Sequence, residues 1–322
     1  MKLGVFSPVL AGKSLSEALA YLKGLGVETI ELGCGGYPGT AHIDAKKLII
    51  DKTACAETKK LIDKSGIEIS ALSVHGNPVH PDKKIAASYN EDFEAACKLA
   101  NAWGVDTVIT FSGCPGDHDG SKYPNWVTCA WPPDYQEILK YQWNDVLVPY
   151  WKKAVAFAAK QNVKKIALEM HPGFCVYNPP TLMRLRHEAG DAIGANFDPS
   201  HLFWQGIDVT EAVFYLNKAI YHFHAKDTGF FDKNKSINGV LDSNSFADES
   251  KRAWIFRSVG YGSSEKVWKD MLSALNMVGY NGALSIEHED SLMDGLEGLE
   301  KAVAFLKPII IKKKKPGDIW WA

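Results

Sequence analysis

Short apolar runs alternate with amphipathic segments along the whole chain. Runs rich in aliphatic residues predict strands, and segments whose apolar residues recur at helical spacing predict helices. The predicted strands span residues 2–7, 28–33, 68–74, 106–112, 165–170, 192–198, 220–225 and 283–288. The predicted helices span residues 15–25, 54–64, 91–103, 135–161, 181–188, 210–218, 265–277 and 296–306. The pattern therefore predicts that strand and helix alternate from end to end.

The ends of the predicted helices carry residues that helix ends require. Ser14 and Asp208 stand at N-cap positions, and glycines such as Gly26 follow several C-termini. The alternation predicts an α/β fold, a single-domain (β/α)8 TIM barrel over residues 1–311, followed by a tail over residues 312–322. A dinucleotide-binding domain has no support, because no G-x-G-x-x-G motif follows the first strand. Residues 113–133 and 228–262 are expected to form long βα loops, the second folding over the barrel mouth.

Side chains of a barrel strand point alternately into the barrel and toward the helices. In KKIALEM and AIGANFD the apolar residues take the outward positions, which leaves Glu169 and Asp198 inward. The same parity directs His224 inward in IYHFHAKD and Glu287 inward in ALSIEHED. In IYHFHAKD the expected helix-facing side chains are Tyr221, Phe223 and Ala225. Four strands are therefore expected to aim an ionisable group at one point near their carboxyl ends.

Two glutamates, an aspartate and a histidine buried around one axis are costly, because like charges resist joint ionisation. Four independent, hydrogen-bonded polar residues are the alternative, but that interpretation leaves their matching positions unexplained. Three carboxylates and one imidazole suit a hard or borderline divalent ion. One divalent metal ion is therefore the expected cofactor, with Mn²⁺ first and Mg²⁺, Co²⁺ or Zn²⁺ as alternatives.

The segments LEMHP, NFDPSH, HFHAKD and SIEHED resemble the metal-binding strand ends of the sugar phosphate isomerase/epimerase superfamily, the xylose isomerase-like TIM barrels. The resemblance extends over nearly the whole chain. It implies that the metal ligands are Glu169, Asp198, His224 and Glu287. It also implies that His201, at D-x-x-H spacing, contacts substrate or a metal-bound water.

Two positions depart from the ketose 3-epimerases of that superfamily. Cys175 stands six residues after the first glutamate, where those enzymes have a substrate-binding glutamate. Phe230 stands six residues after the metal histidine, where they have an arginine. These departures argue against epimerisation of a free ketose.

Other polar residues near the strand ends are candidates for the reaction. His75 and His171 share the inward parity of their strands, so a substrate contact or a catalytic base is weighed against a structural role. Lys226 is either a substrate contact or part of an ordinary ion pair. Arg257 is expected to reach substrate oxygens from the long loop, in place of the arginine missing at position 230, and its alternative is a pair with a surface carboxylate.

Three further polar residues have less direct interpretations. Glu31 points inward and either contacts a sugar hydroxyl or fills a polar layer. His222 lies one layer deeper than the metal histidine and is expected to be a core residue. His288 points outward by parity and is expected to be structural.

Composition narrows the classes of partner. The 322 residues contain 36 Lys and Arg against 38 Asp and Glu, a net charge of −2 that disfavours nucleic acid and anionic membranes as partners. The chain shows no signal-peptide pattern and no long apolar run, so a cytoplasmic protein is expected. Its six cysteines form no C-x-x-C pair and are expected to be reduced. The tail KKKKPGDIWWA is interpreted as solvated, with a homo-oligomer contact or a neighbouring site as the alternative.

Two kinds of chemistry are compatible with a metal at the mouth of a barrel. The leading hypothesis is a sugar isomerase or epimerase that abstracts a proton next to a carbonyl, with Glu169, Glu287 or His171 as base. The alternative is a lyase or dehydratase that expels a β-substituent from a keto-sugar, keto-glycoside or inosose. Phosphodiester hydrolysis is disfavoured, because the chain lacks a basic surface for DNA. A scaffold role would leave the inward carboxylates unexplained.

Overall fold

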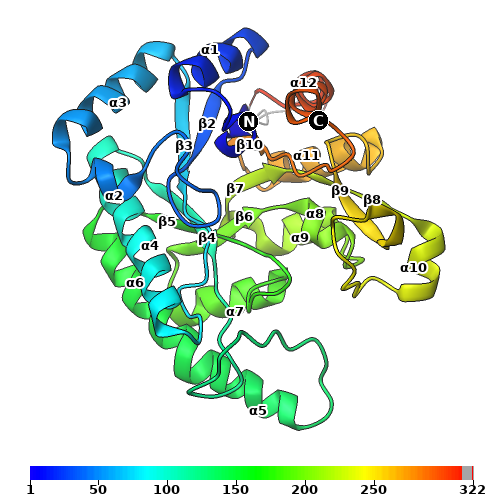
Figure 1. Cartoon of the computed structure of the whole chain (residues 1–322). Helices are drawn as coiled ribbons and strands as arrows, with labels where there is room; N and C mark the ends of the chain where they lie inside the picture. Colours follow the sequence, from blue (N-terminus) through cyan, green and yellow to red (C-terminus); the bar gives the residue numbers. More distant parts are fainter. Residues whose placement is uncertain (314–320, 322) are drawn as a thin grey trace.

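A computed structural model describes residues 1–313 and 321 of the chain. Eight parallel strands close into a barrel in the order β1-β10-β7-β6-β5-β4-β3-β2, and helices surround it (Figure 1). The barrel strands are β1 (Lys2–Phe6), β2 (Thr29–Gly33), β3 (Glu68–Ser73), β4 (Thr107–Phe111), β5 (Lys165–Glu169), β6 (Ile193–Phe197), β7 (Ile220–Ala225) and β10 (Ala283–Ile286). These are the eight strands expected from the sequence, so the predicted (β/α)8 barrel is confirmed.

The outer helices also follow the predicted order. They are α1 (Leu15–Leu25), α3 (Lys52–Ser65), α4 (Lys83–Trp103), α5 (Asp134–Lys140), α6 (Val148–Lys160), α7 (Pro179–Ala189), α9 (Val209–Leu216), α11 (Glu265–Met277) and α12 (Gly295–Leu306). Ser14 caps α1 in a capping box with Glu17, and Gly26 ends this helix with φ of 73°. Within residues 1–313 no helix has the length and apolar character needed to cross a membrane.

Several boundaries differ from the sequence-based expectation. The helix expected over residues 135–161 is interrupted by a π-helical segment, η2 (Tyr141–Leu147), between α5 and α6. From η2, buried Gln142 donates hydrogen bonds to three carbonyls of the preceding long loop. Helix α4 begins at Lys83 because Asp82 caps it. The additional short elements are η1 (Ser7–Leu10), α2 (Ala45–Leu48), α8 (Pro199–Phe203), η3 (Asn217–Ala219), α10 (Asp232–Asn238) and η4 (Glu249–Lys251).

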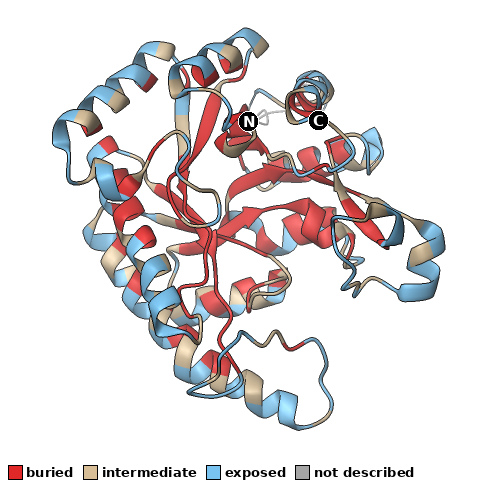
Figure 2. Ribbon diagram, viewed as in Figure 1, coloured by how far each residue is buried: buried red, intermediate tan, exposed pale blue. Residues whose placement is uncertain are grey.

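The buried residues form a continuous apolar layer between the strands and the helices, and the outer helix faces are exposed (Figure 2). A small separate cluster of Ala71, Ile109 and Ala167 fills the barrel interior. Tyr221 packs against this cluster, so its expected helix-facing orientation is wrong. The pairing of β6 with β7 shifts register between Ala195 and Asn196, and this bulge changes the alternation at Tyr221.

The long loop after β7 contains regular structure that the sequence pattern did not predict. Strands β8 (Asp227–Phe230) and β9 (Trp254–Arg257) pair as an antiparallel ribbon, with α10 between them. The ring of Phe256 on β9 lies 5.2 Å from the ring of His201, so this segment reaches the barrel mouth. Residues 312, 313 and 321 of the tail are described, whereas Lys314, Lys315 and Trp320 lie outside the described residues.

Buried Asp227 ties this segment to the barrel. Its carboxylate accepts hydrogen bonds from the Nε1 of Trp268 and from the backbone amides of Thr228, Gly260, Gly262 and Ser263. Gly262 permits the close approach, because a Cβ atom there would lie 2.3 Å from the oxygen of Thr228. One carboxylate therefore holds the start and the end of the long segment together.

We expect Asp227→Ala to lower the free energy of unfolding by about 3 kcal/mol, because several buried donors would lose their acceptor. Urea denaturation measures this change. The control Asp208→Ala removes an exposed N-cap of α9 and should cost only about 1 kcal/mol. Equal costs for the two variants would contradict the anchoring role of Asp227.

Candidate metal centre

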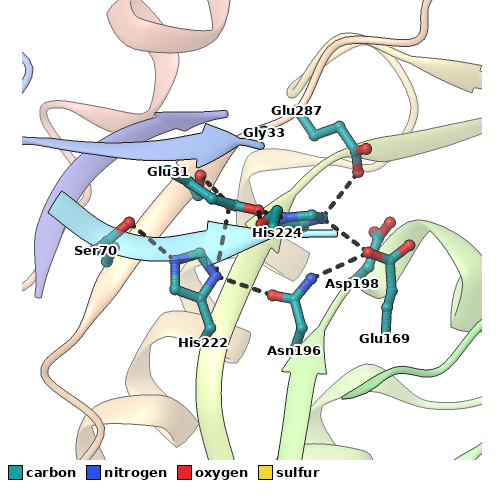
Figure 3. A network of polar contacts seen from close by, with 12 residues as sticks. Glu31, Gly33, Ser70, Glu169, Asn196, Asp198, His222, His224 and Glu287 are labelled. Atoms are coloured by element: carbon teal, nitrogen blue, oxygen red, sulfur yellow. Dashed lines mark hydrogen bonds and ion pairs between the residues drawn. The ribbon is translucent and has the colours of Figure 1, made fainter. Parts of the chain in front are cut away.

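Four side chains from neighbouring strand ends meet at the barrel mouth. Glu169 ends β5, Asp198 directly follows β6, His224 lies in β7 and Glu287 directly follows β10. Each offers a ligand atom, and these atoms lie within 4.8 Å of one another (Figure 3). The structure thus brings together the four residues for which metal ligation was predicted, and all come from rigid elements of the barrel.

The charges and hydrogen bonds of this cluster test whether a cation fits. Three buried atoms, Asp198 Oδ2, His224 Nδ1 and Glu287 Oε2, have no hydrogen-bond partner among the described residues. They do lie at ion-pair distance: His224 Nδ1 is 3.0 Å from Glu287 Oε2 and 3.1 Å from Glu169 Oε2. Buried polar atoms are usually satisfied, and oxygen and imidazole nitrogen atoms are good ligands for divalent ions. The residues present therefore fit a divalent cation.

Glu31 on β2 orients the imidazole of His224. His224 Nε2 lies 2.9 Å from Glu31 Oε2 and donates to this carboxylate. Glu31 is itself held by hydroxyl donors, from Ser73 and, at 2.7 Å, from Ser285. Because Nε2 donates to Glu31, Nδ1 is the ring nitrogen that faces the four-residue cluster. Burial by itself would lower the pKa of His224, but Glu31 and Glu287 raise it well above the usual range, so Nδ1 would release its proton when it ligates a cation. Of the two roles considered for Glu31, the contacts favour the polar layer.

A second chain of contacts supports Glu169 from below (Figure 3). Asn196 donates from Nδ2 to Glu169 Oε2 at 3.1 Å, and its Oδ1 lies 3.0 Å from His222 Nδ1. His222 Nε2 in turn faces the hydroxyl of Ser70 at 3.2 Å. Burial lowers the pKa of His222 to about 4, so this histidine is neutral. His222 is thus a satisfied core residue, as expected from its depth in the barrel.

Two further histidines contact Glu169, and of these His75 lines the cavity described below. His75 Nε2 lies 3.0 Å from Glu169 Oε2, and His201 Nε2 lies 3.1 Å from Glu169 Oε1. Burial by itself would raise the pKa of Glu169, but hydrogen bonds from His201, His224 and His75 hold it well below the usual range. Glu169 is therefore an ionised carboxylate whose oxygens already accept several donors.

His171 has a different environment. Its Nδ1 donates to the carbonyl of Pro172 at 2.6 Å, and its ring centroid lies 4.0 Å from that of His201. Burial, followed by the electrostatic effect of neighbouring His201, lowers the pKa of His171 to about 3. Its other ring nitrogen is consequently an unprotonated acceptor beside the cavity.

Lys226, directly after β7, is almost completely buried beside the cluster. Its Nζ lies 3.1 Å from Asp198 Oδ2, 2.8 Å from Glu287 Oε2 and 2.8 Å from Glu289 Oε2. Burial would lower the pKa of Lys226, but the three carboxylates raise it well above the usual range. The charge of Lys226 also affects Glu287. Burial by itself would raise the pKa of Glu287, but Lys226 and His224 hold it well below the usual range. Lys226 is therefore an ammonium ion inside the mouth.

A cavity of about 180 Å³ opens onto this cluster. Its lining combines apolar and aromatic residues with ionisable groups. The lining residues are Phe6, Pro8, Val9, Tyr37, Pro38, His75, Phe111, Glu169, His171, Lys226, Glu287, His288 and Glu289. Of the side chains proposed to bind substrate, His75 and Lys226 therefore lie at the cavity.

Other predicted positions lie elsewhere. Arg257 is absent from the lining, and its Nε donates to the buried carboxylate of Asp290 at 3.0 Å. This corresponds to the ion-pair alternative, with a buried carboxylate as partner. Cys175 is buried, and all six cysteines are free thiols. Phe230 is exposed, with Lys235 Nζ 4.1 Å from its ring centroid.

Glu289 was not among the site residues predicted from the sequence. This residue lines the cavity and bonds to Lys226. It stands two residues after Glu287 and so has the same strand parity, which would have been a sufficient signal. The aromatic wall of Phe6 and Phe111 was missed because nothing in a buried strand distinguishes a cavity wall from the core.

The chain belongs to the family described as xylose isomerase-like TIM barrel, whose model matches residues 19–309. It is 36% identical over 312 residues to the uncharacterized protein YfiH of Bacillus subtilis strain 168, covering 96% of this chain and 99% of YfiH. Among solved structures it resembles the zinc-bound IolI protein, with a TM-score of 0.65, 18% identity and coverage of 96% of both chains. It also resembles the 3-keto-D-glucoside 4-epimerase YcjR of E. coli, with a TM-score of 0.63, 13% identity and coverage of 96% and 99%.

We expect Glu31→Gln to weaken Mn²⁺ binding by 10- to 100-fold, because the amide no longer enforces the Nε2-protonated form of His224. Isothermal titration calorimetry measures the affinity. Glu68→Gln, at the exposed opposite end of neighbouring β3, serves as the control and should leave the affinity unchanged. A Glu31→Gln variant with wild-type affinity would show that Glu31 does not orient the ligand.

Proposed function

We propose that this protein is a divalent-metal-dependent sugar isomerase or epimerase that abstracts a proton next to the carbonyl of a sugar or keto-sugar. The observation that carries the proposal is the convergence of Glu169, Asp198, His224 and Glu287, three of which present buried atoms without hydrogen bonds. The same four residues would hold the ion. Zinc in IolI and the keto-glucoside epimerase activity named for YcjR support this choice within the family.

The bound ion would act as a Lewis acid that polarises the substrate carbonyl and favours ionisation of the neighbouring C–H bond. Glu287 is suited to receive the proton because its side chain lines the cavity, and the carboxylate oxygen that does not bind the ion would accept it. His171 is a second acceptor, held in one tautomer by the carbonyl of Pro172. Glu169 is less suited, because His75, His201 and Asn196 already donate to it.

The residues around the base determine the outcome of proton removal. Return of the proton to the opposite face of the same carbon gives epimerisation, and delivery to the neighbouring carbon gives isomerisation. His75 and Lys226 lie at the cavity, where they would bind sugar hydroxyls, and His201 would reach substrate or a metal-bound water through its position beside Asp198. The apolar lining residues, such as Phe6 and Phe111, would exclude water from the reacting carbon.

One observation favours elimination as a second candidate. Buried Cys175 and exposed Phe230 stand where the ketose 3-epimerases have a glutamate and an arginine. By contrast, the imidazoles of His171 and His201 lie close together at the barrel mouth, with ring centroids 4.0 Å apart. An imidazole that protonates a β-substituent would turn the same C–H cleavage into a lyase or dehydratase reaction.

Solvent exchange tests the proposal. The protein is incubated with Mn²⁺ in D₂O with a panel of ketoses, keto-glycosides and inososes. Deuterium should appear at the carbon next to the carbonyl of the substrate, and a chelator should abolish its incorporation. Loss of a β-substituent would identify the lyase alternative, and absence of exchange from every compound would count against C–H cleavage.

We expect Glu287→Gln to keep the fold and to lose more than 90% of turnover, because the amide neither accepts the proton nor balances the metal charge. The rate of deuterium incorporation, with the compound that exchanges in the experiment above, measures the loss. Circular dichroism checks the fold. Glu297→Gln, on the exposed face of α12, serves as the control and should retain turnover. A metal-loaded Glu287→Gln variant retaining more than about a tenth of kcat, a loss below about 1.4 kcal/mol, would refute its assigned role.

A further inference from the structure

The ammonium of Lys226 contacts two of the atoms on which the proposed metal site depends. Asp198 Oδ2 and Glu287 Oε2 have no hydrogen bonds, yet Lys226 Nζ lies 3.1 and 2.8 Å from them. Lys226 is 1% exposed, so water screens these contacts only weakly. The positive charge of Lys226 therefore lies next to the carboxylates that would neutralise a bound divalent ion.

A resident ammonium has two opposite effects on such a site. Without a metal ion it offsets the mutual repulsion of buried carboxylates, which otherwise destabilises the folded state. When a metal ion binds, the same positive charge repels it at short range in a poorly screened environment. The metal affinity of the site is then lower than the four ligands alone would give.

The structure also contains a place for the ammonium outside the ligand cluster. Glu289 accepts a hydrogen bond from Lys226 Nζ at 2.8 Å, and its side chain is half exposed. Nζ also lies 4.6 Å from the ring centroid of Phe256, which belongs to β9 in the long segment after β7. Glu289 and Phe256 together can hold the charge when Asp198 and Glu287 turn to another cation.

We propose that Lys226 is a built-in counter-ion that competes with the divalent ion for Asp198 and Glu287, and that Glu289 retains its ammonium when the ion binds. This inference rests on the metal site of the proposed function. It assigns Lys226 a role in metal loading that is separate from any contact with substrate.

The test compares Mn²⁺ affinity by calorimetry and melting temperature, with and without Mn²⁺, for the wild type and Lys226→Met. The methionine keeps much of the side-chain length and removes the charge. Lys226→Met should bind Mn²⁺ at least tenfold more tightly, melt lower than the wild type without metal, and gain more on metal addition. Lys165→Met, which removes a lysine paired with Asp106 far from the mouth, should change neither the affinity nor the gain.

Each outcome decides between the alternatives. Unchanged or weaker Mn²⁺ binding by Lys226→Met would overturn the inference and would show that the lysine assists the ligands. If the wild type itself binds no divalent ion, the proposed metal-dependent function fails first. If Lys226→Met and Lys226→Gln fold only with Mn²⁺ present, the counter-ion role is supported, and failure to fold under either condition overturns it.

Glu289→Gln in both backgrounds tests the second half of the proposal. In the wild type this change should weaken Mn²⁺ binding severalfold, because the ammonium loses its alternative partner. In the Lys226→Met background the effect should fall below twofold. An equal effect in both backgrounds would mean that Glu289 acts on the ion by charge alone, which overturns its role as the partner of Lys226.

Discussion

Repulsion among carboxylates is the constraint that the barrel mouth has to satisfy. Glu31, Glu169 and Asp198 are buried, and Glu287 is only slightly exposed, within one polar layer above an apolar barrel interior. A layer of this composition requires positive charge inside it, because burial leaves only weak screening by water. The protein supplies His224 and Lys226 at the centre, and the proposed metal ion would complete the neutralisation.

The surrounding structure fixes the direction in which each ligand atom points. Asp198 Oδ1 accepts the amide of Ser200 at 2.8 Å where α8 begins, which leaves Oδ2 facing the cluster. Glu31, held by two serine hydroxyls, sets the tautomer of His224. Preorganisation of this kind reduces the rearrangement needed when an ion binds, because each ligand lies in a barrel strand or directly after one.

The sequence predicted this convergence because two local rules were sufficient. Strand parity and the equivalence of strand ends in a parallel barrel placed Glu169, Asp198, His224 and Glu287 together without knowledge of tertiary contacts. Parity failed at Tyr221, where a bulge between β6 and β7 changes the alternation. A register shift depends on the pairing partner, and the sequence of one strand does not carry it.

Local sequence patterns also failed to predict two features of the long loop after β7, its β-ribbon and the partner of Arg257. The β8–β9 ribbon joins short strands separated by a helix, and no turn signature connects them. Arg257 was expected near substrate because of its position in the chain, whereas its partner, buried Asp290, comes from the loop after β10. Such pairs depend on how two loops fold against each other.

The central claim is that one divalent ion binds at the four strand ends. Anomalous diffraction at the manganese edge, from crystals grown with Mn²⁺, tests it most directly. The account predicts one strong peak per chain, with donor atoms of Glu169, Asp198, His224 and Glu287 at roughly 2.0 to 2.4 Å from it. A bound ion elsewhere, or these four side chains more than about 6 Å apart in the presence of Mn²⁺, would contradict the claim, since ligands of one ion lie within about 5 Å of each other.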